Sequence, residues 1–336
     1  MNKVLVDTLY INMGGGKVLA DYLIEKLEHS SLNVHFLLDE RIKGNHAEIK
    51  RNKVTYVKAS IRNRYEFYKS NHNEFTKVFC FASLPPFIRL KAEVYTYFHQ
   101  SLYLKVPDNS GFKLSVFSEI KSNISRILKN NTDFWIVQSS NVKKQLATKY
   151  NLEESQVKVI PFYPHFEQII NVVRKNKTYS FVSLPAPYKN HERLIKAFVL
   201  FYEKSGHGEL HLTVTTAFPH LLNEIERLQL TGIPIVNHGF LNKQELSTLY
   251  KSSEYVIFPS LAESFGLGIV EALENGCKIM GADLPYMRAV CEPSISFNPE
   301  SIPDILIAFE KSIDSDVKPS RQLVFDEIEQ LIKLLS

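Results

Sequence analysis

The chain has 336 residues, which is too long for one ordinary hydrophobic core and predicts two domains. Hydrophobic residues make up 44% of it and charged residues 23%, which excludes a disordered protein, and no apolar run approaches the roughly 20 residues of a membrane-spanning helix. The net charge of +4 is unevenly divided, because residues 1–165 carry 24 Lys and Arg against 15 Asp and Glu, while residues 166–336 carry 16 against 21.

Strand-like and helix-like segments alternate through the first half of the chain. Short runs rich in β-branched and aromatic residues predict strands, and they fall at residues 3–10, 33–39, 53–59, 77–83, 93–99, 134–140 and 157–163. Apolar residues at helical spacing predict helices, and these fall at residues 16–29, 115–128 and 142–150. Such alternation is typical of a parallel sheet with helices on both faces.

The alternation restarts after a polar, basic stretch at residues 171–178. Strands are expected at residues 179–184, 210–216, 234–240, 255–260, 278–283 and 294–298, and helices at 190–202, 221–228 and 243–251, with two more at the end of the chain. The predicted fold class is therefore α/β with two doubly wound domains. We expect an N-terminal domain at 1–165, a second domain at 166–318, and a C-terminal helix at 319–336 that would pack back toward the first domain.

Two glutamates lie eight positions apart in the segment ESFGLGIVEALENG. Glu263 follows the predicted strand at 255–260, so it stands at the carboxyl end of the sheet, where doubly wound domains bind ligands. A helix is expected to begin near Gly266, and glycines there let a ligand approach the backbone. The N–H groups of residues 265–268 and the helix dipole would suit a phosphate.

Glu271 lies about one helical turn further along, where its carboxylate could accept two hydrogen bonds from a ribose diol. A simpler interpretation is that both glutamates favour the positive end of a helix dipole. That interpretation explains the combination of glycines, strand and spacing poorly. The expected site is the cleft between the two domains.

Residues 259–285 resemble the signature of the retaining glycosyltransferases of family 4 (glycosyl transferases group 1), which use nucleotide sugars and have the two-domain GT-B fold. The family motif is a glutamate, seven residues and a second glutamate, matched by Glu263 and Glu271. The resemblance is specific over residues 235–290. It implies that residues before and inside the motif bind the donor, namely Gly239, Phe240, Ser264, Phe265, Gly266, Leu267 and Glu271. In the family, the backbone around Gly239 and Phe240 contacts the nucleobase of the donor.

Lys189 stands directly before a predicted helix, after the first strand of the second domain. By resemblance it would neutralise the donor diphosphate. The family often has an arginine five residues earlier, where this chain has Leu184, so more of the phosphate charge would fall to Lys189 and the helix dipole.

Gly14, Gly15 and Gly16 lie between the first strand and the first helix, without the GxGxxG spacing of a dinucleotide fingerprint. They suit either a plain tight turn or a backbone that approaches a ligand. By resemblance this loop faces the diphosphate. His99 directly follows a strand, and the resemblance implies that it orients the sugar or the acceptor hydroxyl.

The implied catalytic residues are thus Glu263, His99 and Lys189. In the family the departing phosphate helps to deprotonate the acceptor, which retains the anomeric configuration. Glu263 would hold sugar hydroxyls and support positive charge on the ring. It would not be the nucleophile of a retaining glycosidase, which uses two closely paired carboxylates.

No metal and no cofactor are expected, because no HxxE or HxH cluster is present. Asp314-Ser315-Asp316 has the DxD pattern of metal-dependent glycosyltransferases, but it joins two terminal helices beside Lys318 and Pro319. We expect a solvated loop there.

The predicted function is a retaining, metal-independent, hexosyltransferase-like enzyme of bacterial surface polysaccharide synthesis. Its partners would be a nucleoside diphosphate sugar and a polyprenyl-diphosphate-linked glycan. The basic stretch with Arg62, Arg64, Tyr65, Phe67, Tyr68 and Lys69 could contact anionic lipid. We expect a cytoplasmic, peripheral membrane protein, since the three cysteines show no paired spacing and the N-terminal apolar stretch is too short for a secretory signal.

Two alternatives remain open at this point. One is a sugar-nucleotide epimerase or hydrolase on the same fold. The other is a non-catalytic protein that binds nucleic acid through its basic half, although the chain has no RNP, helix-turn-helix or zinc-finger spacing. No nucleic-acid partner is therefore expected.

Overall fold

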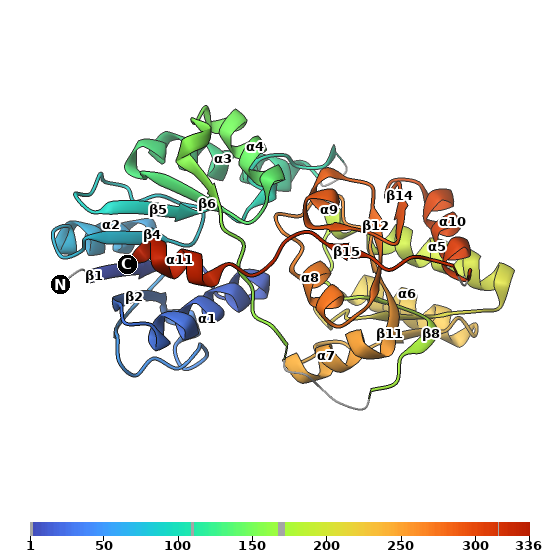
Figure 1. Ribbon diagram of the computed structural model, residues 1–336. Helices are drawn as coiled ribbons and strands as arrows, with labels where there is room; N and C mark the ends of the chain where they lie inside the picture. The colour runs from blue at the N-terminus through green and yellow to red at the C-terminus, as the bar shows by residue number, and fades with distance from the viewer. Residues whose placement is uncertain (1–2, 109–110, 167–171, 315) are drawn as a thin grey trace. The chain divides into compact units, whose positions relative to one another are not determined.

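The computed structural model describes residues 3–108, 111–166, 172–314 and 316–336. The chain forms two compact units, each built around its own parallel sheet (Figure 1). Unit 1 contains Met1–Val106, Phe112–Pro164 and Phe325–Ser336, and unit 2 contains Pro107–Gly111 and His165–Val324.

Unit 1 is centred on a seven-stranded sheet of order β3-β2-β1-β4-β5-β6-β7 in which all strands are parallel. The strands are β1 Lys3–Asp7, β2 Asn33–Asp39, β3 Lys53–Val57, β4 Lys77–Cys80, β5 Glu93–Tyr97, β6 Phe134–Val137 and β7 Val157–Val159. Consecutive residues such as Val4, Leu5 and Val6 are fully buried. Both faces of the sheet are therefore covered, as is usual for parallel sheets.

The helices of unit 1 are α1 Gly14–His29, α2 Ile61–Asn71, α3 Phe112–Ile127, α4 Ser140–Tyr150 and α11 Ile328–Leu335. Short 3-10 turns lie at Glu40–Ile42, Ser101–Tyr103, Leu128–Asn131 and Glu154–Gln156. The strand order changes direction between β1 and β4, so the loops after these strands flank the switch point at which doubly wound sheets bind ligands.

Unit 2 has a six-stranded parallel sheet of order β10-β9-β8-β11-β12-β14. Its strands are β8 Lys175–Phe181, β9 Glu209–Leu212, β10 Ile235–Asn237, β11 Ser253–Phe258, β12 Lys278–Ala282 and β14 Ile295–Phe297. Its helices are α5 His191–Ser205, α6 Pro219–Leu230, α7 Lys243–Ser252, α8 Leu267–Glu274, α9 Pro285–Val290 and α10 Ile302–Ser312, with a 3-10 turn at Pro187–Lys189. Here the order changes direction between β8 and β11.

The predicted α/β class with two doubly wound domains is confirmed. The helix predicted over residues 319–336 is shorter than expected and begins at Ile328. Residues 321–322 instead form β15, which pairs antiparallel with β13 Cys291–Glu292 in unit 2. Pro319 lacks the N–H that a helix interior needs, which explains the extended backbone there.

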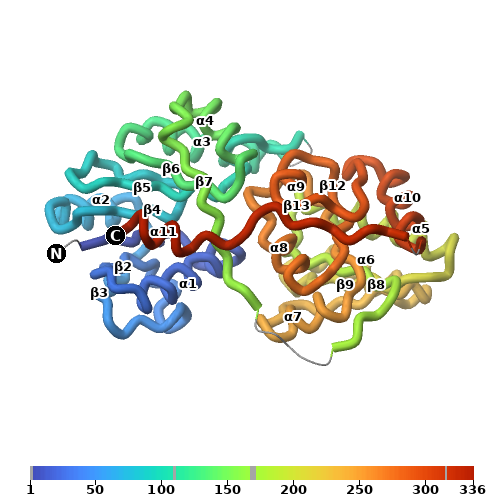
Figure 2. The backbone as a smooth tube through the Cα atoms, in the orientation of Figure 1, coloured from blue at the N-terminus to red at the C-terminus, as the bar shows by residue number. Residues whose placement is uncertain are grey.

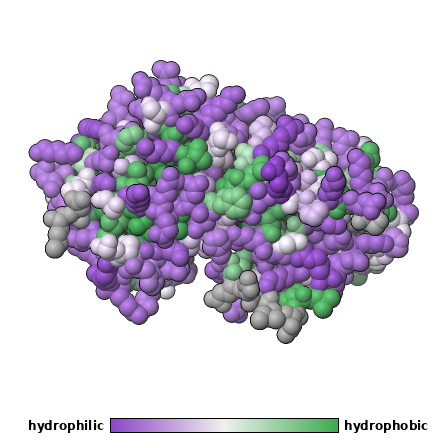
Figure 3. Space-filling model, viewed as in Figure 1, coloured by the Kyte–Doolittle hydropathy of each residue, from purple (hydrophilic) through white to green (hydrophobic). Residues whose placement is uncertain are grey.

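The end of the chain belongs to unit 1, where α11 contacts α1 (Figure 2). Ile328, Leu331 and Leu335 are buried there, and Lys77 Nζ on β4 donates to the Leu334 carbonyl at 2.9 Å. The face of the molecule drawn in Figure 3 is largely hydrophilic, with smaller hydrophobic patches. Within the described residues, no helix is both long and apolar enough to cross a membrane.

Candidate active site

Lys189 and Glu263 form an ion pair at the switch point of the unit 2 sheet. Lys189 ends the 3-10 turn after β8, and Glu263 lies in the loop after β11. Lys189 Nζ donates to Glu263 Oε1 at 2.5 Å, and the side chains are only 18% and 12% exposed. Leu261 N donates to the Tyr188 carbonyl at 2.7 Å, which fixes the two loops to each other. The site thus presents one ammonium and one carboxylate that a ligand could separate.

Gly266 shapes the N-terminus of α8. It has a φ of +78°, and a Cβ there would lie 2.6 Å from Ile269 Cδ1, so a side chain would be both strained and blocked. Gly266 has no side chain that could cap the helix, which leaves the first N–H groups of α8 suited to an anionic ligand. A Cβ on Gly268 would lie 3.3 Å from the Tyr250 hydroxyl, so that glycine serves close packing against α7.

Glu271 is buried inside unit 2, with 8% of its surface exposed. Tyr250 OH on α7 donates to Glu271 Oε2 at 3.3 Å. Burial raises the pKa of Glu271 to about 7, against the smaller lowering effect of the Tyr250 hydrogen bond. The carboxyl group is therefore poised between its protonated and charged forms at neutral pH, and a ligand that donates hydrogen bonds to it would favour the charged form.

The Gly239–Phe240 loop follows β10 beside a histidine pair that sequence reasoning missed. Gly239 has a φ of +65° and Phe240 is 83% exposed. His211 Nδ1 lies 2.9 Å from His238 Nε2, and His211 Nε2 lies 2.7 Å from a Glu209 carboxylate oxygen. Burial lowers the pKa of both histidines, which favours their neutral forms, and the contact between the rings ties the residue before Gly239 to β9. Their only signal in the sequence was a histidine within one predicted strand, at 210–216, and another near the end of the next, at 234–240.

In unit 1, His99 and the glycine loop lie together at the switch point. Gly14 has a φ of +66°, and a Cβ on Gly16 would lie 3.6 Å from His99 Nε2. Ser83 Oγ, in the loop after β4, accepts from the His99 backbone N–H at 3.0 Å. Burial lowers the pKa of His99 to about 4, so the ring is neutral and can act as a hydrogen-bond partner without a charge.

A buried ion pair supports these loops, and sequence reasoning missed it. Arg64 on α2 is 1% exposed, and its Nε donates to Asp7 Oδ2 at 2.7 Å. Its Nη1 and Nη2 donate to the carbonyls of Pro85 and Leu84 at 2.9 and 2.8 Å. Arg64 thereby joins the end of β1 to the loop that carries Ser83.

Tyr68 completes this cluster by donating to Asp7 Oδ2 at 2.7 Å. The expectation that Arg64 and Tyr68 contact lipid is therefore wrong, since both side chains are inside the protein. This basic stretch of the sequence forms an amphipathic helix, and two residues on its buried face donate hydrogen bonds to the carboxylate of Asp7.

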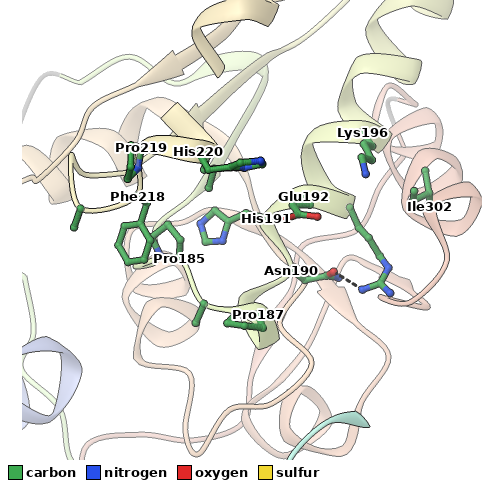
Figure 4. A pocket seen from close by; sticks show the side chains of 14 residues that line it. Pro185, Pro187, Asn190, His191, Glu192, Lys196, Phe218, Pro219, His220 and Ile302 are labelled. Atoms are coloured by element: carbon green, nitrogen blue, oxygen red, sulfur yellow. Dashed lines mark hydrogen bonds between the residues drawn. The ribbon is translucent and has the colours of Figure 1, made fainter. Parts of the chain in front are cut away.

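Unit 2 also contains a separate pocket of about 790 Å³ at the start of α5 (Figure 4). Its lining comes from residues 185–187, 190–193, 196, 217–221 and 302. Lys189, Glu263 and Gly266 are not among these lining residues, so the pocket is not the predicted donor site. His191 lines it, and burial lowers the pKa of this histidine to about 4.

The two aspartates of the DxD pattern follow the end of α10. Asp314 and Asp316 are exposed beyond the end of α10, and Ser315 between them lies outside the described residues. In the part of the chain that the structure describes, no group of three or more His, Cys, Asp and Glu could hold a metal ion. The cysteines Cys80, Cys277 and Cys291 are free and buried.

Part of the chain matches a known protein family. Residues 163–296 match the family model of the glycosyl transferases group 1. Over 135 residues the chain is 30% identical to the serotype-specific mannosyltransferase WbdA of Escherichia coli, which covers 39% of this chain and 17% of that protein. Over 189 residues it is 24% identical to the O-antigen chain mannosyltransferase RfbU of Salmonella typhimurium, covering 55% of this chain and 50% of that protein. The chain thus spans half or less of the length of these curated relatives.

Solved structures with the same fold cover nearly the whole chain. Anabaena Alr3699/HepE in complex with UDP and glucose has a TM-score of 0.67 at 14% identity, over 94% of this chain and 90% of that one. The lipopolysaccharide outer core galactosyltransferase WaaB has a TM-score of 0.65 at 16% identity, over 95% and 92%. These neighbours show that the chain has the GT-B fold of two Rossmann-like domains, and residues 163–296 resemble the glycosyl transferases group 1.

Proposed function

We propose that this protein transfers a sugar from a nucleoside diphosphate sugar to an acceptor hydroxyl, with retention at the anomeric carbon. The observation that carries the proposal is the Lys189–Glu263 pair at the β8/β11 switch point, next to the glycine-bearing start of α8. This arrangement provides a cation, an anion-binding helix end and a carboxylate within one ligand-sized region.

The donor diphosphate is assigned to Lys189 and the first N–H groups of α8. When the sugar–phosphate bond breaks, negative charge grows on the departing diphosphate, and preorganised donors stabilise that charge without reorganising. The 2.5 Å contact to Glu263 holds the Lys189 ammonium in place before the donor arrives. A phosphate would compete for this ammonium and release the Glu263 carboxylate.

Glu263 and Glu271 are assigned to different ends of the donor. The released Glu263 carboxylate accepts hydrogen bonds from the hydroxyls of the transferred sugar and favours positive charge on its ring. Glu271 accepts from the ribose hydroxyls, with the Tyr250 hydroxyl fixing its orientation. The group that directly contacts Glu263 is a lysine and not a second carboxylate, so the arrangement does not resemble the nucleophile pair of a retaining glycosidase.

His99 is assigned to orienting a hydroxyl of the transferred sugar or the acceptor. A neutral imidazole can accept a hydrogen bond at one nitrogen and donate at the other. Gly14, Gly15 and Gly16 would let ligand atoms approach the ring, since a side chain at Gly16 would reach His99 Nε2. Gly239 and Phe240 are assigned to the nucleobase.

We infer a lipid-linked glycan of a bacterial surface polysaccharide as the acceptor. Two relatives are named as O-antigen or serotype-specific mannosyltransferases, and one structural neighbour is a lipopolysaccharide galactosyltransferase. The donor class is supported by the UDP and UDP-glucose complexes of Alr3699/HepE. The transfer is proposed to need no metal, because Lys189 and α8 supply the positive charge.

A panel of UDP, GDP, dTDP and CMP sugars, followed by thermal stability, tests the proposal. A ligand that binds only the folded state stabilises it by about 2.7 kcal/mol at a hundredfold excess over its dissociation constant. The stabilising donor is then incubated with lipid-linked acceptors, and the anomeric proton of the product is examined by NMR with and without EDTA. We expect a glycoside with the donor's configuration in both reactions. Free sugar or an epimer without a glycoside would instead favour the epimerase or hydrolase alternative.

A further inference from the structure

Helix α3, Phe112–Ile127, packs against the rest of unit 1 with its polar face, which is the face that helices usually turn toward solvent. Its buried residues are Ser118, Ser122 and Ser125. Its large apolar side chains point outward, with Phe112 84%, Val116 41%, Phe117 57%, Ile120 54% and Ile127 76% exposed. Surface helices of globular proteins normally bury such a stripe.

The outward apolar side chains share one side of the helix. At about 100° per residue, these five positions fall within an arc of about 140° around the helix, and the three serines lie on the opposite side. The whole helix is therefore oriented with its apolar side outward, because the exposed positions include five residues and not a single side chain. Contiguous apolar surface of this kind marks an interaction site.

The serine face is firmly attached to the protein. Ser125 Oγ donates to the Ser83 carbonyl at 2.8 Å, and Ser122 Oγ lies 3.5 Å from the Tyr150 hydroxyl of α4. Because Ser83 also accepts from the His99 backbone, α3 is two hydrogen bonds away from a proposed active-site residue. A partner bound on the outer face of α3 would therefore be separated from the loop of Ser83 and His99 by the width of one helix, about 10–12 Å.

Cationic side chains accompany the apolar face. Lys113 lies within the apolar arc, while Lys121 and Arg126 lie at its two edges, and all three are exposed. Lys121 Nζ lies 4.1 Å from the centroid of the Phe117 ring. The helix's acidic residue, Glu119, is already paired with Lys149 of α4 at 2.7 Å. Aromatic and aliphatic residues with lysine and arginine at their borders fit the interface of an anionic bilayer.

We propose that the outer face of α3 docks on anionic phospholipid, with its apolar side chains at the acyl boundary and its cations among the headgroups. A second copy of the chain fits this face less well, because its Lys113 and Lys121 would meet like charges. The inference rests on the proposed function and deepens it, since it would bring unit 1 to the lipid surface that carries a lipid-linked acceptor. It also replaces α2 as the lipid-facing element of unit 1.

Vesicle co-sedimentation of the full chain tests this surface. We expect binding to vesicles of phosphatidylglycerol and phosphatidylethanolamine, and at least about tenfold weaker binding to phosphatidylcholine vesicles. The double change Phe117→Ser and Ile120→Ser should reduce binding by about tenfold or more, since it removes two insertable side chains. The matched apolar control is Leu230→Ser, at a side chain 90% exposed at the end of α6.

A charge-reversal pair compares the two helices directly. Lys113→Glu with Lys121→Glu on α3 should reduce binding by about tenfold or more. Arg62→Glu with Lys69→Glu makes the same change at two exposed positions of α2, and it should change binding less than about twofold. If the α2 pair lost as much binding as the α3 pair, general electrostatic attraction would be the cause and the proposal would be wrong.

A fluorescence measurement gives a positive signal in a folded variant. The single native tryptophan, Trp135, is 1% exposed, so an added tryptophan can be followed above it. Phe117→Trp should show a blue shift and quenching by brominated lipid on anionic vesicles, whereas Leu230→Trp should not. No change at residue 117 would overturn the proposal even if the chain sediments with vesicles.

The outcomes separate this inference from the proposed function. A chain that is stabilised by a nucleotide sugar but ignores anionic vesicles would leave the function standing and refute the docking surface. A chain that binds vesicles through α3 but is stabilised by no nucleotide sugar would refute the proposed function and leave the docking surface standing. If Phe117→Ser with Ile120→Ser converted a dimer into a monomer and left vesicle binding unchanged, the occupant would be a second copy and the proposal would be wrong.

Discussion

At the scale of single residues, Glu263 accepts a hydrogen bond from the Lys189 ammonium, whereas Glu271 is buried beside the Tyr250 hydroxyl. The first carboxylate has a partner that a phosphate can remove, and the second has a raised pKa. Two identical side chains eight positions apart therefore have different chemical capacities, which individual substitutions can separate.

Replacing Lys189 by Ala should weaken nucleoside diphosphate binding far more than nucleoside binding. Charge-assisted hydrogen bonds are worth about 1.5–3 kcal/mol, so we expect a loss of roughly tenfold to a hundredfold for the diphosphate. Isothermal titration with both ligands measures it. Lys204→Ala is the control, because this residue lies on α5 with its side chain 70% exposed. Equal losses for diphosphate and nucleoside would show that Lys189 does not meet the phosphates.

The changes Glu263→Gln and Glu271→Gln should have opposite signatures. Glu271→Gln should weaken binding of the bare nucleoside diphosphate, because ribose contacts are already made in that ligand. Glu263→Gln should leave that binding nearly intact and lower kcat, because its contact strengthens as the sugar ring becomes positive. Titration with the diphosphate and initial rates with the true donor decide between them. The reverse pattern would exchange the two roles.

The pKa of Glu271 also predicts a pH dependence of stability. Burial raises this pKa from its usual 4.5 to about 7, so the folded state binds the proton more tightly than the unfolded chain does. The resulting stabilisation is complete below pH 4.5 and is lost as the pH rises through 7, and it amounts to roughly 3 kcal/mol. Between pH 4.5 and pH 8, the unfolding free energy of the wild type should fall by about this much relative to Glu271→Gln. Parallel curves for the two proteins would contradict the raised pKa.

At the scale of helices and strands, the order of elements was predictable because parallel strands are continuous apolar runs and their helices have apolar stripes. The places of Glu263, Gly266 and Glu271 between a strand end and the following helix were predictable too, since their spacing is fixed in the sequence. The orientation of α3 was not, because an apolar stripe does not specify which neighbour covers it. For α2 the sequence showed a run of charges, and only the fold reveals that Arg64 faces Asp7.

The ion pair between Arg64 of α2 and Asp7 should contribute to the thermal stability of the protein. Arg64→Leu leaves Asp7 buried without its cation, which typically costs about 3–5 kcal/mol. We expect the midpoint of thermal unfolding to fall by several degrees, while Arg62→Leu, at an exposed position of α2, should change it little. Calorimetry of the two variants measures the difference. Equal stability of both variants would mean that Arg64 is not required to compensate Asp7.

At the scale of the whole molecule, residues 325–336 return to unit 1 and pack into it. Ile328, Leu331 and Leu335 are buried there, and Glu327 N donates to the Pro161 carbonyl at 2.7 Å. Unit 1 is therefore assembled from segments at both ends of the sequence. Unit 2 lies between them in the chain and contains Lys189, Glu263 and Glu271.

Leu331→Ala should consequently destabilise unit 1 without weakening the proposed donor site. Removing a fully buried leucine side chain costs about 2–5 kcal/mol. In calorimetric scans we expect this variant to lower one unfolding transition, while a nucleoside diphosphate raises the other by binding unit 2. Lys333→Ala, at an exposed position of the same helix, is the control and should leave both transitions unchanged. If Leu331→Ala also abolished diphosphate binding, the donor site would depend on α11, and its assignment to the residues of unit 2 alone would be wrong.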